Sequence, residues 1–133
     1  FGFLDFKDRD GIVSSIYIIH LIIESGLSIS QILESINKIT GPTYIARKDL
    51  EFNSINRSDL INSLKNLKPN DIYEFGLSYL DEQDGFKFSY NDGSWILIRI
   101  SGTENLIRIY SESIDQETAD IMISNLIKCI NIS

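Results

Sequence analysis

The sequence predicts an α+β fold in which helices pack on one face of an antiparallel sheet. Three observations support this prediction. Hydrophobic residues make up 43% of the 133 residues and charged residues 23%, which is typical of a globular domain. Strand-like runs follow one another in the second half of the chain, and Asp84-Gly85 and Asn91-Asp92-Gly93 are hairpin signals between them. Helical patterns precede and follow these runs.

The first expected helix spans Ile12 to Glu24. Asp10 is a plausible N-cap, and Ser25-Gly26 ends the helix because glycine readily terminates helices. Apolar side chains occupy nearly its whole circumference, so this helix needs burial on all sides, and little else in the chain could cover it. We therefore expect an isolated chain to self-associate through Ile12 to Ile23.

A second helix is expected to start at Ser28 or Ser30 and to end at Gly41-Pro42. This Gly-Pro pair is the best candidate for a domain boundary. The interpretation is that residues 1–41 are the end of one domain with a linking helix, and that residues 42–133 form a separate C-terminal domain.

After this boundary we expect an extended segment, a short helix, four strands and a last helix. The extended segment is Thr43 to Phe52, and the short helix is capped by Asn56, Ser58 or Asp59 and broken by Lys68-Pro69-Asn70-Asp71. The expected strands are Ile72 to Leu80, Phe86 to Tyr90, Ser94 to Ile100 and Leu106 to Glu112.

The last helix runs from about Asp115, its cap, to Cys129. Its expected buried stripe consists of Ile114, Ala119, Met122, Ile123, Leu126 and Ile130. Trp95 alternates with isoleucine and leucine on a strand and is expected in the core. Cys129 is the only cysteine, so no intrachain disulfide can form, and we expect a buried structural thiol.

Charge and composition exclude several classes of function. The formal net charge of -7 gives no basic surface for nucleic acid or an anionic membrane. The apolar stretch from Ile12 to Ile23 is too short to span a bilayer, and no secretory signal is visible. A cytoplasmic location fits these observations and the single cysteine. Because the chain opens with Phe1, we interpret it as an excised or processed piece.

One loop has the groups that a phosphate dianion requires. Ser101-Gly102-Thr103-Glu104-Asn105 lies between two expected strands, with Arg99 before it and Arg108 after it. Arginine provides permanent charge and bidentate donors, and the hydroxyls of serine and threonine donate hydrogen bonds. Gly102 lets its backbone approach an oxygen and adopt unusual dihedral angles, and successive N–H groups can form an anion nest. The alternative is a polar hairpin turn with an arginine at each strand end.

The longer string Arg-x-Ser-Gly-Thr-Glu-Asn-x-x-Arg-x-Tyr-x-Glu, from Arg99 to Glu112, resembles the phosphate-binding loop of the α-D-phosphohexomutases, the phosphoglucomutase/phosphomannomutase family. A second resemblance lies upstream, where Asp8-Arg9-Asp10-Gly11-Ile12 precedes an apolar helix, as at the end of the family's third domain. The resemblance covers nearly the whole chain. It implies the end of domain 3, a linking helix and a complete domain 4 with a fold like that of the TATA-binding protein.

The resemblance also implies an activity. Members of this family are isomerases that interconvert hexose 1-phosphates and 6-phosphates through a bisphosphorylated intermediate. A phosphoserine in domain 1 transfers the phosphoryl group, domain 2 holds Mg²⁺, and domain 4 clamps the phosphate that does not react. By this correspondence Arg99, Ser101, Gly102 and Thr103 bind the substrate phosphate, and Glu104, Asn105 and Arg108 complete or orient the loop.

Two positions depart from the family pattern. Asn105 stands where proline is commoner, and Arg9 stands where many members have lysine, so Arg9 is a candidate only for active-site electrostatics. Asp8-Arg9-Asp10-Gly11 also resembles part of a calcium loop, but Phe6 and Tyr17 would occupy its end positions. We therefore predict no metal site in this chain and expect Mg²⁺ on a missing N-terminal domain.

Two hypotheses follow. The chain is the substrate-phosphate-binding part of a hexose-phosphate mutase, binds a hexose phosphate together with missing N-terminal domains, and is inactive alone. Alternatively, it is a stand-alone, non-catalytic α+β module that binds a phosphorylated ligand or partner. The first expected helix distinguishes the two hypotheses, because a self-sufficient domain should cover the apolar surface of this helix.

Overall fold

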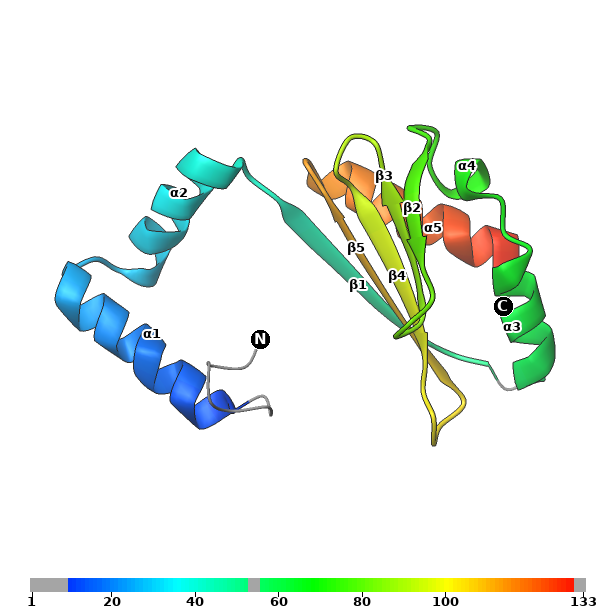
Figure 1. Cartoon of the computed structure of the whole chain (residues 1–133), viewed down its shortest axis with the longest axis horizontal. Helices are drawn as coiled ribbons and strands as arrows, with labels where there is room; N and C mark the ends of the chain where they lie inside the picture. Colours follow the sequence, from blue (N-terminus) through cyan, green and yellow to red (C-terminus); the bar gives the residue numbers. More distant parts are fainter. Residues whose placement is uncertain (1–9, 53–55, 131–133) are drawn as a thin grey trace. The chain divides into compact units, whose positions relative to one another are not determined.

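The computed structural model describes residues 10–52 and 56–130, and contacts along the chain divide it into two compact units between Gly41 and Pro42 (Figure 1). In its described residues, 10–41, the first unit contains two helices. The second contains the sheet and three further helices.

The first unit begins with α1, Gly11–Ser25, which differs from the expected helix by one residue at each end. The Asp10 carboxylate accepts hydrogen bonds from the backbone N–H groups of Ile12 and Val13 at 2.9 and 3.0 Å, so it is the N-cap. Gly26 ends the helix with φ 64°, a left-handed conformation that glycine adopts without strain.

The second helix, α2, spans Ile29–Thr40. Ser28 and Gln31 form a reciprocal capping box at its start, and the Gly41 N–H bonds back to the Asn37 carbonyl at its end. Neither α1 nor α2 has a buried residue, and the exposed fraction reaches 76% at Ile12 and 87% at Ile39. No single described helix is long and apolar enough to cross a membrane, although α1 and α2 together have that length and composition across a 90° bend.

The second unit is built on one antiparallel sheet with the strand order β1-β5-β4-β3-β2. The first strand of this unit, β1, therefore lies at one edge of the sheet. It pairs with the last strand, β5, which in turn pairs with the central strand β4. The bounds of the strands are β1 Tyr44–Glu51, β2 Leu77–Asp81, β3 Phe86–Tyr90, β4 Trp95–Ile100 and β5 Leu106–Ser113.

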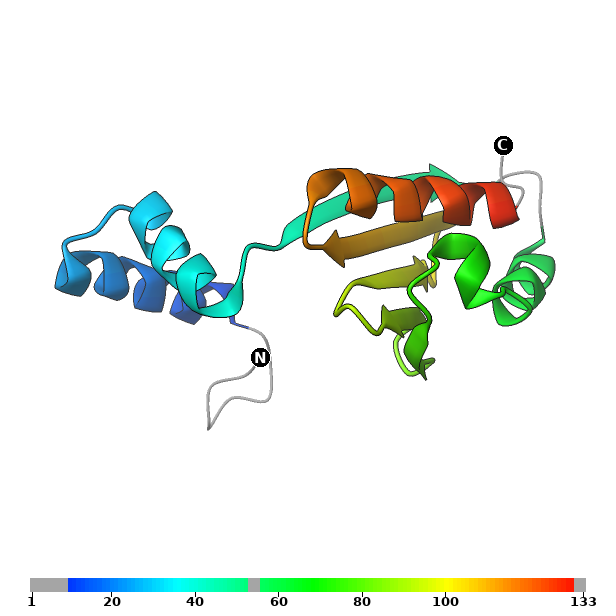
Figure 2. The ribbon, with the colours of Figure 1, turned by 90° about the horizontal axis from the view of Figure 1, so that it is seen from above.

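Three helices accompany this sheet: α3 Arg57–Lys65, α4 Pro69–Ile72 and α5 Gln116–Ile130. Figure 2 shows α5 lying along the sheet, and the buried residues of α3 and α4 belong to the same core as those of α5. That core contains the inward residues of β3, β4 and β5, which alternate with residues on the opposite, open face. The α+β fold predicted from the sequence is confirmed.

Some details differ from expectation. Pro69 ends the preceding segment but also starts α4, because proline suits the first position of a helix; Ile72 is fully buried there, and β2 begins only at Leu77. Ile114 is 64% exposed and does not belong to the buried stripe of α5, since it lies before the Asp115 cap. Cys129 is only partly buried, and this burial raises the pKa of its thiol.

Candidate functional site

The loop between β4 and β5 closes a hairpin at one end of the sheet (Figure 1). The Ser101 N–H donates to the Leu106 carbonyl at 2.8 Å, which closes the turn. Below it, Ile100 lies opposite Ile107 and Arg99 lies opposite Arg108. Gly102 to Asn105 are all exposed, so a ligand can reach the whole loop.

Arg99 lies on the open face of the sheet. Its strand neighbour Ile98 points into the core, and successive side chains of a strand point to opposite faces. Within the described residues, the Arg99 guanidinium has neither a hydrogen bond nor an ion pair. Gly85, at φ 133°, lies so close to β4 that an added Cβ would be 2.3 Å from the Ile98 carbonyl oxygen and 3.2 Å from Arg99 Cγ.

Arg108, by contrast, already has acidic neighbours. Its Nη2 atom is 3.6 Å from Glu104 Oε2, and its Nε atom is 4.0 Å from Asp49 Oδ2. Asp49 lies opposite Arg108 because β1 pairs with β5. The charge of Arg108 is thus partly compensated by acidic side chains, whereas no acidic side chain in the described part of the chain compensates that of Arg99.

Several donors of the loop have no partner among the described residues, and two of its carbonyl acceptors, those of Ser101 and Asn105, are occupied. The Ser101 hydroxyl oxygen accepts from the Glu104 N–H at 3.3 Å, and this leaves its own hydrogen free to donate. The Ser101 carbonyl accepts from Arg57, and the Asn105 carbonyl accepts from the Phe52 N–H at 3.0 Å. In the described part of the chain, no hydrogen bond uses the N–H groups of Gly102, Thr103 and Asn105 or the Thr103 hydroxyl. A group of this kind favours an anion.

Gly102 differs from the expectation that it would use an unusual dihedral angle. Its φ lies outside the left-handed region, and a Cβ added to it would meet no atom within 4 Å. The folded chain therefore does not require glycine at this position. The glycine instead leaves open space next to the free Gly102 N–H, and this space allows a ligand to approach closely.

The remaining cations of the open face have partners of their own. Arg47 forms a bidentate pair with Asp49, at 2.9 and 2.7 Å, and lies 5.4 Å from the centre of the Tyr110 ring. The Arg47 hydrogen bonds lower the pKa of Asp49. Lys87 lies 4.5 Å from the Trp95 ring centre, so Trp95 is a partly exposed residue of this face and not a core residue.

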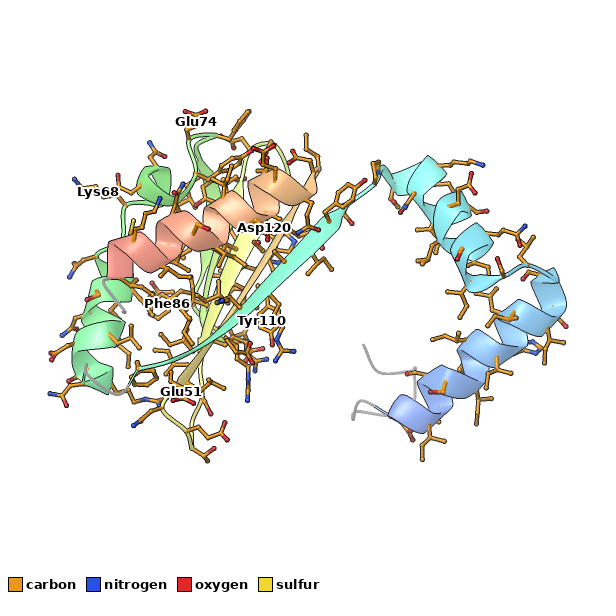
Figure 3. The ribbon with its side chains drawn as sticks, turned by 180° about the vertical axis from the view of Figure 1, so that it is seen from behind. Glu51, Lys68, Glu74, Phe86, Tyr110 and Asp120 are labelled. Atoms are coloured by element: carbon orange, nitrogen blue, oxygen red, sulfur yellow. The ribbon has the colours of Figure 1, made fainter. Side chains whose placement is uncertain are left out.

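A shallow hollow of about 380 Å³ lies on one side of the loop and is lined by Glu51, Glu104, Asn105 and Leu106. Figure 3 shows Glu51 at the same end of the sheet as the loop. Two carboxylates make this hollow unfavourable for a phosphate. The free donors of Gly102 and Thr103 and the Arg99 guanidinium are consequently the groups of the loop to which an anion is best suited.

Arg9 lies outside the described residues. Within those residues, no group of three or more His, Cys, Asp and Glu side chains is arranged to hold a metal ion. Sequence reasoning missed Arg57 and Asp49, which contact the loop or its arginine from distant segments and belong to no motif.

Comparison with known proteins gives a consistent family. Residues 46–124 match the family model described as "Phosphoglucomutase/phosphomannomutase, C-terminal domain". A protein of Thermococcus kodakarensis named "Phosphoglucomutase/phosphomannomutase" is 30% identical over 111 residues, which cover 84% of this chain and 22% of the relative. A "Probable phosphoglucosamine mutase" of Methanothermobacter thermautotrophicus is 32% identical over 110 residues, or 83% of this chain and 23% of the relative.

A third relative, a "Phosphopentomutase" of Thermococcus kodakarensis, is 53% identical over 36 residues, which are 27% of this chain and 8% of the relative. The chain spans less than a quarter of the length of these curated relatives. The family model nevertheless matches more than half of the chain, including β4, the loop and β5. The chain therefore belongs to the phosphoglucomutase/phosphomannomutase family, whose C-terminal domain it contains.

Proposed function

We propose that the segment from Arg99 to Arg108 binds the phosphate group of a hexose phosphate, and that the chain does so as the C-terminal domain of an enzyme that interconverts hexose 1-phosphates and 6-phosphates. One observation carries the proposal. The N–H groups of Gly102 and Thr103 and the guanidinium of Arg99 lack protein partners within the described residues, while the carbonyls of Ser101 and Asn105 are already engaged.

Energetics support binding at this loop. A hydrogen bond to a charged group contributes about 1.5–3 kcal/mol. Three or four such bonds would fix the position of a phosphate but would break no covalent bond. The contribution of this domain is therefore to hold the remote phosphate and to orient the reacting end of the sugar. The phosphoserine that transfers the phosphoryl group, and the Mg²⁺ that assists it, are assigned to domains that precede this one in the family's order.

The family mechanism adds a requirement for motion. A bisphosphorylated intermediate has to reorient so that each of its phosphates is presented in turn. The C-terminal domain is expected to open and close during each turnover, as mobile parts of many enzymes do. The affinity of the loop must then be moderate, and this agrees with the acidic neighbours that Arg108 already has among the described residues, which reduce its attraction for a phosphate.

A titration of the 133-residue chain tests the binding proposal. Inorganic phosphate and glucose 1-phosphate should each shift the backbone amide resonances of Gly102 and Thr103, whereas glucose should leave them unchanged. Shifts confined to residues outside the loop, or equal shifts with glucose, would contradict the proposal.

The matched variants are Gly102→Ala and Gly11→Ala. Both glycines have φ outside the left-handed region and no atom within 4 Å of an added Cβ, so neither change should lower the unfolding temperature. Gly102→Ala should weaken phosphate binding by about fivefold or more, because the methyl group occupies the space next to the donors; one hydrogen bond corresponds to about 1 kcal/mol. Gly11→Ala should bind like the unmodified chain. Equal binding by both variants would mean that the ligand does not approach the Gly102 backbone.

A further inference from the structure

A residue outside the loop forms a hydrogen bond with one peptide group of the loop. Arg57, the first residue of α3, donates a hydrogen bond from Nη1 to the carbonyl oxygen of Ser101, 44 residues further along the chain. A second tie joins the same regions, because the Phe52 N–H donates to the Asn105 carbonyl. Arg57 at the start of α3 and Phe52 just after β1 thus each contact one end of the loop.

The position of Arg57 is unfavourable for the helix that contains it. A cation at the first position of a helix opposes the helix dipole, which carries partial positive charge at that end. The N-cap residue Asn56 makes no side-chain capping bond, and no ion pair of Arg57 occurs among the described residues. Stabilisation of α3 therefore does not explain this arginine, and its one described interaction is the bond to the loop.

The geometry of the peptide bond links this contact to ligand binding. In a trans peptide the C=O and the following N–H point in opposite directions, because the group is planar. When Arg57 holds the Ser101 carbonyl, it also fixes the direction of the Gly102 N–H, away from Arg57. Glycine imposes little restriction on rotation of this peptide, and the space around Gly102 is open, so no other described contact prevents a flip.

We propose that Arg57 is a positioning residue for phosphate binding, which holds the Ser101–Gly102 peptide with its N–H directed to the ligand. This inference rests on the proposed function of the loop. A flipped peptide would present a carbonyl oxygen to the phosphate, so that one donor is lost and one repulsive acceptor is gained. Arg57 thereby increases the affinity of the loop for anions without contacting the anion.

The test uses the 133-residue chain and inorganic phosphate, followed by backbone amide resonances. Arg57→Met retains the apolar stem of the side chain but cannot donate a hydrogen bond. Lys65→Met, in the last turn of the same helix, removes the same charge at an exposed position and is the matched control. Arg57→Lys retains a donor and should restore most of the affinity.

Arg57→Met should weaken phosphate binding by about fivefold, the effect expected for one hydrogen bond. It should also shift the Gly102 amide resonance before any phosphate is added, and it should leave the unfolding temperature within the range of the Lys65→Met control. The ratio of affinities should persist between about 0.1 M and about 0.5 M sodium chloride, where the screening length falls from about 10 Å to about half of that.

Each other result overturns the inference in a distinguishable way. If the unmodified chain binds no phosphate, the proposed function fails, and the inference fails with it. If it binds phosphate and Arg57→Met binds equally well, only the positioning role is wrong. If the loss disappears at high salt, or Lys65→Met and Arg57→Met lose affinity alike, the arginine acts through its charge and not through the peptide.

Discussion

Replacement of Arg99 by methionine should separate affinity from stability. Arg99 is exposed and has no partner among the described residues, so its removal leaves no buried group unsatisfied. Its cross-strand neighbour is Arg108, and like charges directly opposite each other in a sheet are destabilising. Methionine keeps an apolar stem next to Gly85, which lies near Arg99 Cγ. The free energy of unfolding should thus remain unchanged or rise by a few tenths of a kcal/mol.

Phosphate binding should move in the opposite direction. A bidentate guanidinium contact to a phosphate contributes about 1.5–3 kcal/mol, and this corresponds to about 10-fold to 150-fold in the dissociation constant. The assay is a phosphate titration followed by the Gly102 and Thr103 amides, together with thermal unfolding of the same samples. In a complete mutase, the matching Arg99→Ala change should raise KM and lower kcat/KM at least about tenfold.

Arg47→Met is the control on the same face of the sheet. Arg47 is bound by Asp49 and lies over the Tyr110 ring, so its loss should lower stability modestly and leave phosphate binding nearly unchanged. The reasoning would be refuted if Arg99→Met binds phosphate as the unmodified chain does. Equal losses for both variants would refute it too, because they would indicate attraction to the face as a whole.

Three further predictions concern stability and association. Gly85→Ala should lower the free energy of unfolding by about 1–3 kcal/mol, because φ 133° is strained for alanine and the added Cβ would lie 2.3 Å from the Ile98 carbonyl; an unchanged unfolding temperature would contradict this. Asp115 caps α5, and hydrogen bonds from Thr118 lower the pKa of its carboxyl group, so its contribution to the free energy of unfolding is present above the ordinary pKa of 3.8 and is lost as pH falls through the folded pKa. Asp115→Asn should therefore make the free energy of unfolding fall less steeply in acid. If the unmodified chain and the variant lose stability in parallel as pH falls, this role of Asp115 is excluded. The exposed isoleucines of α1 should cause association that rises with concentration in light scattering and falls in Ile16→Glu, whereas a monomer at every concentration would contradict it.

Much of the fold follows from the sequence because its signals are local. Alternation in Trp95 to Ile100 fixes which residues share a face, and the same pattern places Arg99 opposite the core face. The short helix α4 was not predictable, since proline is both a helix breaker and a good first helical residue. The core position assigned to Trp95 was wrong because hydrophobicity outweighed alternation in that interpretation.

In the candidate site, too, some residues can be predicted from local sequence and others cannot. Ser101 to Asn105 are contiguous, so a motif can identify them together. Asp49 lies near Arg108 only because β1 pairs with β5, and no turn signal in the sequence predicts this long-range pairing. The contact between Arg57 and Ser101 depends on where α3 begins relative to the sheet. Local sequence therefore predicts the candidate phosphate-binding groups but not the distant residues that contact them.

An anion site in a chain of net charge -7 requires an explanation in terms of single groups. Acidic side chains already neighbour Arg47 and Arg108, and the hollow next to the loop is lined by carboxylates. These acids repel anions that approach them, so we expect a phosphate to bind only where it uses the backbone donors and Arg99 together. Such a site selects by geometry rather than by bulk charge. We also expect the proposed site to bind a phosphate weakly enough to release it, which a densely basic pocket would not do.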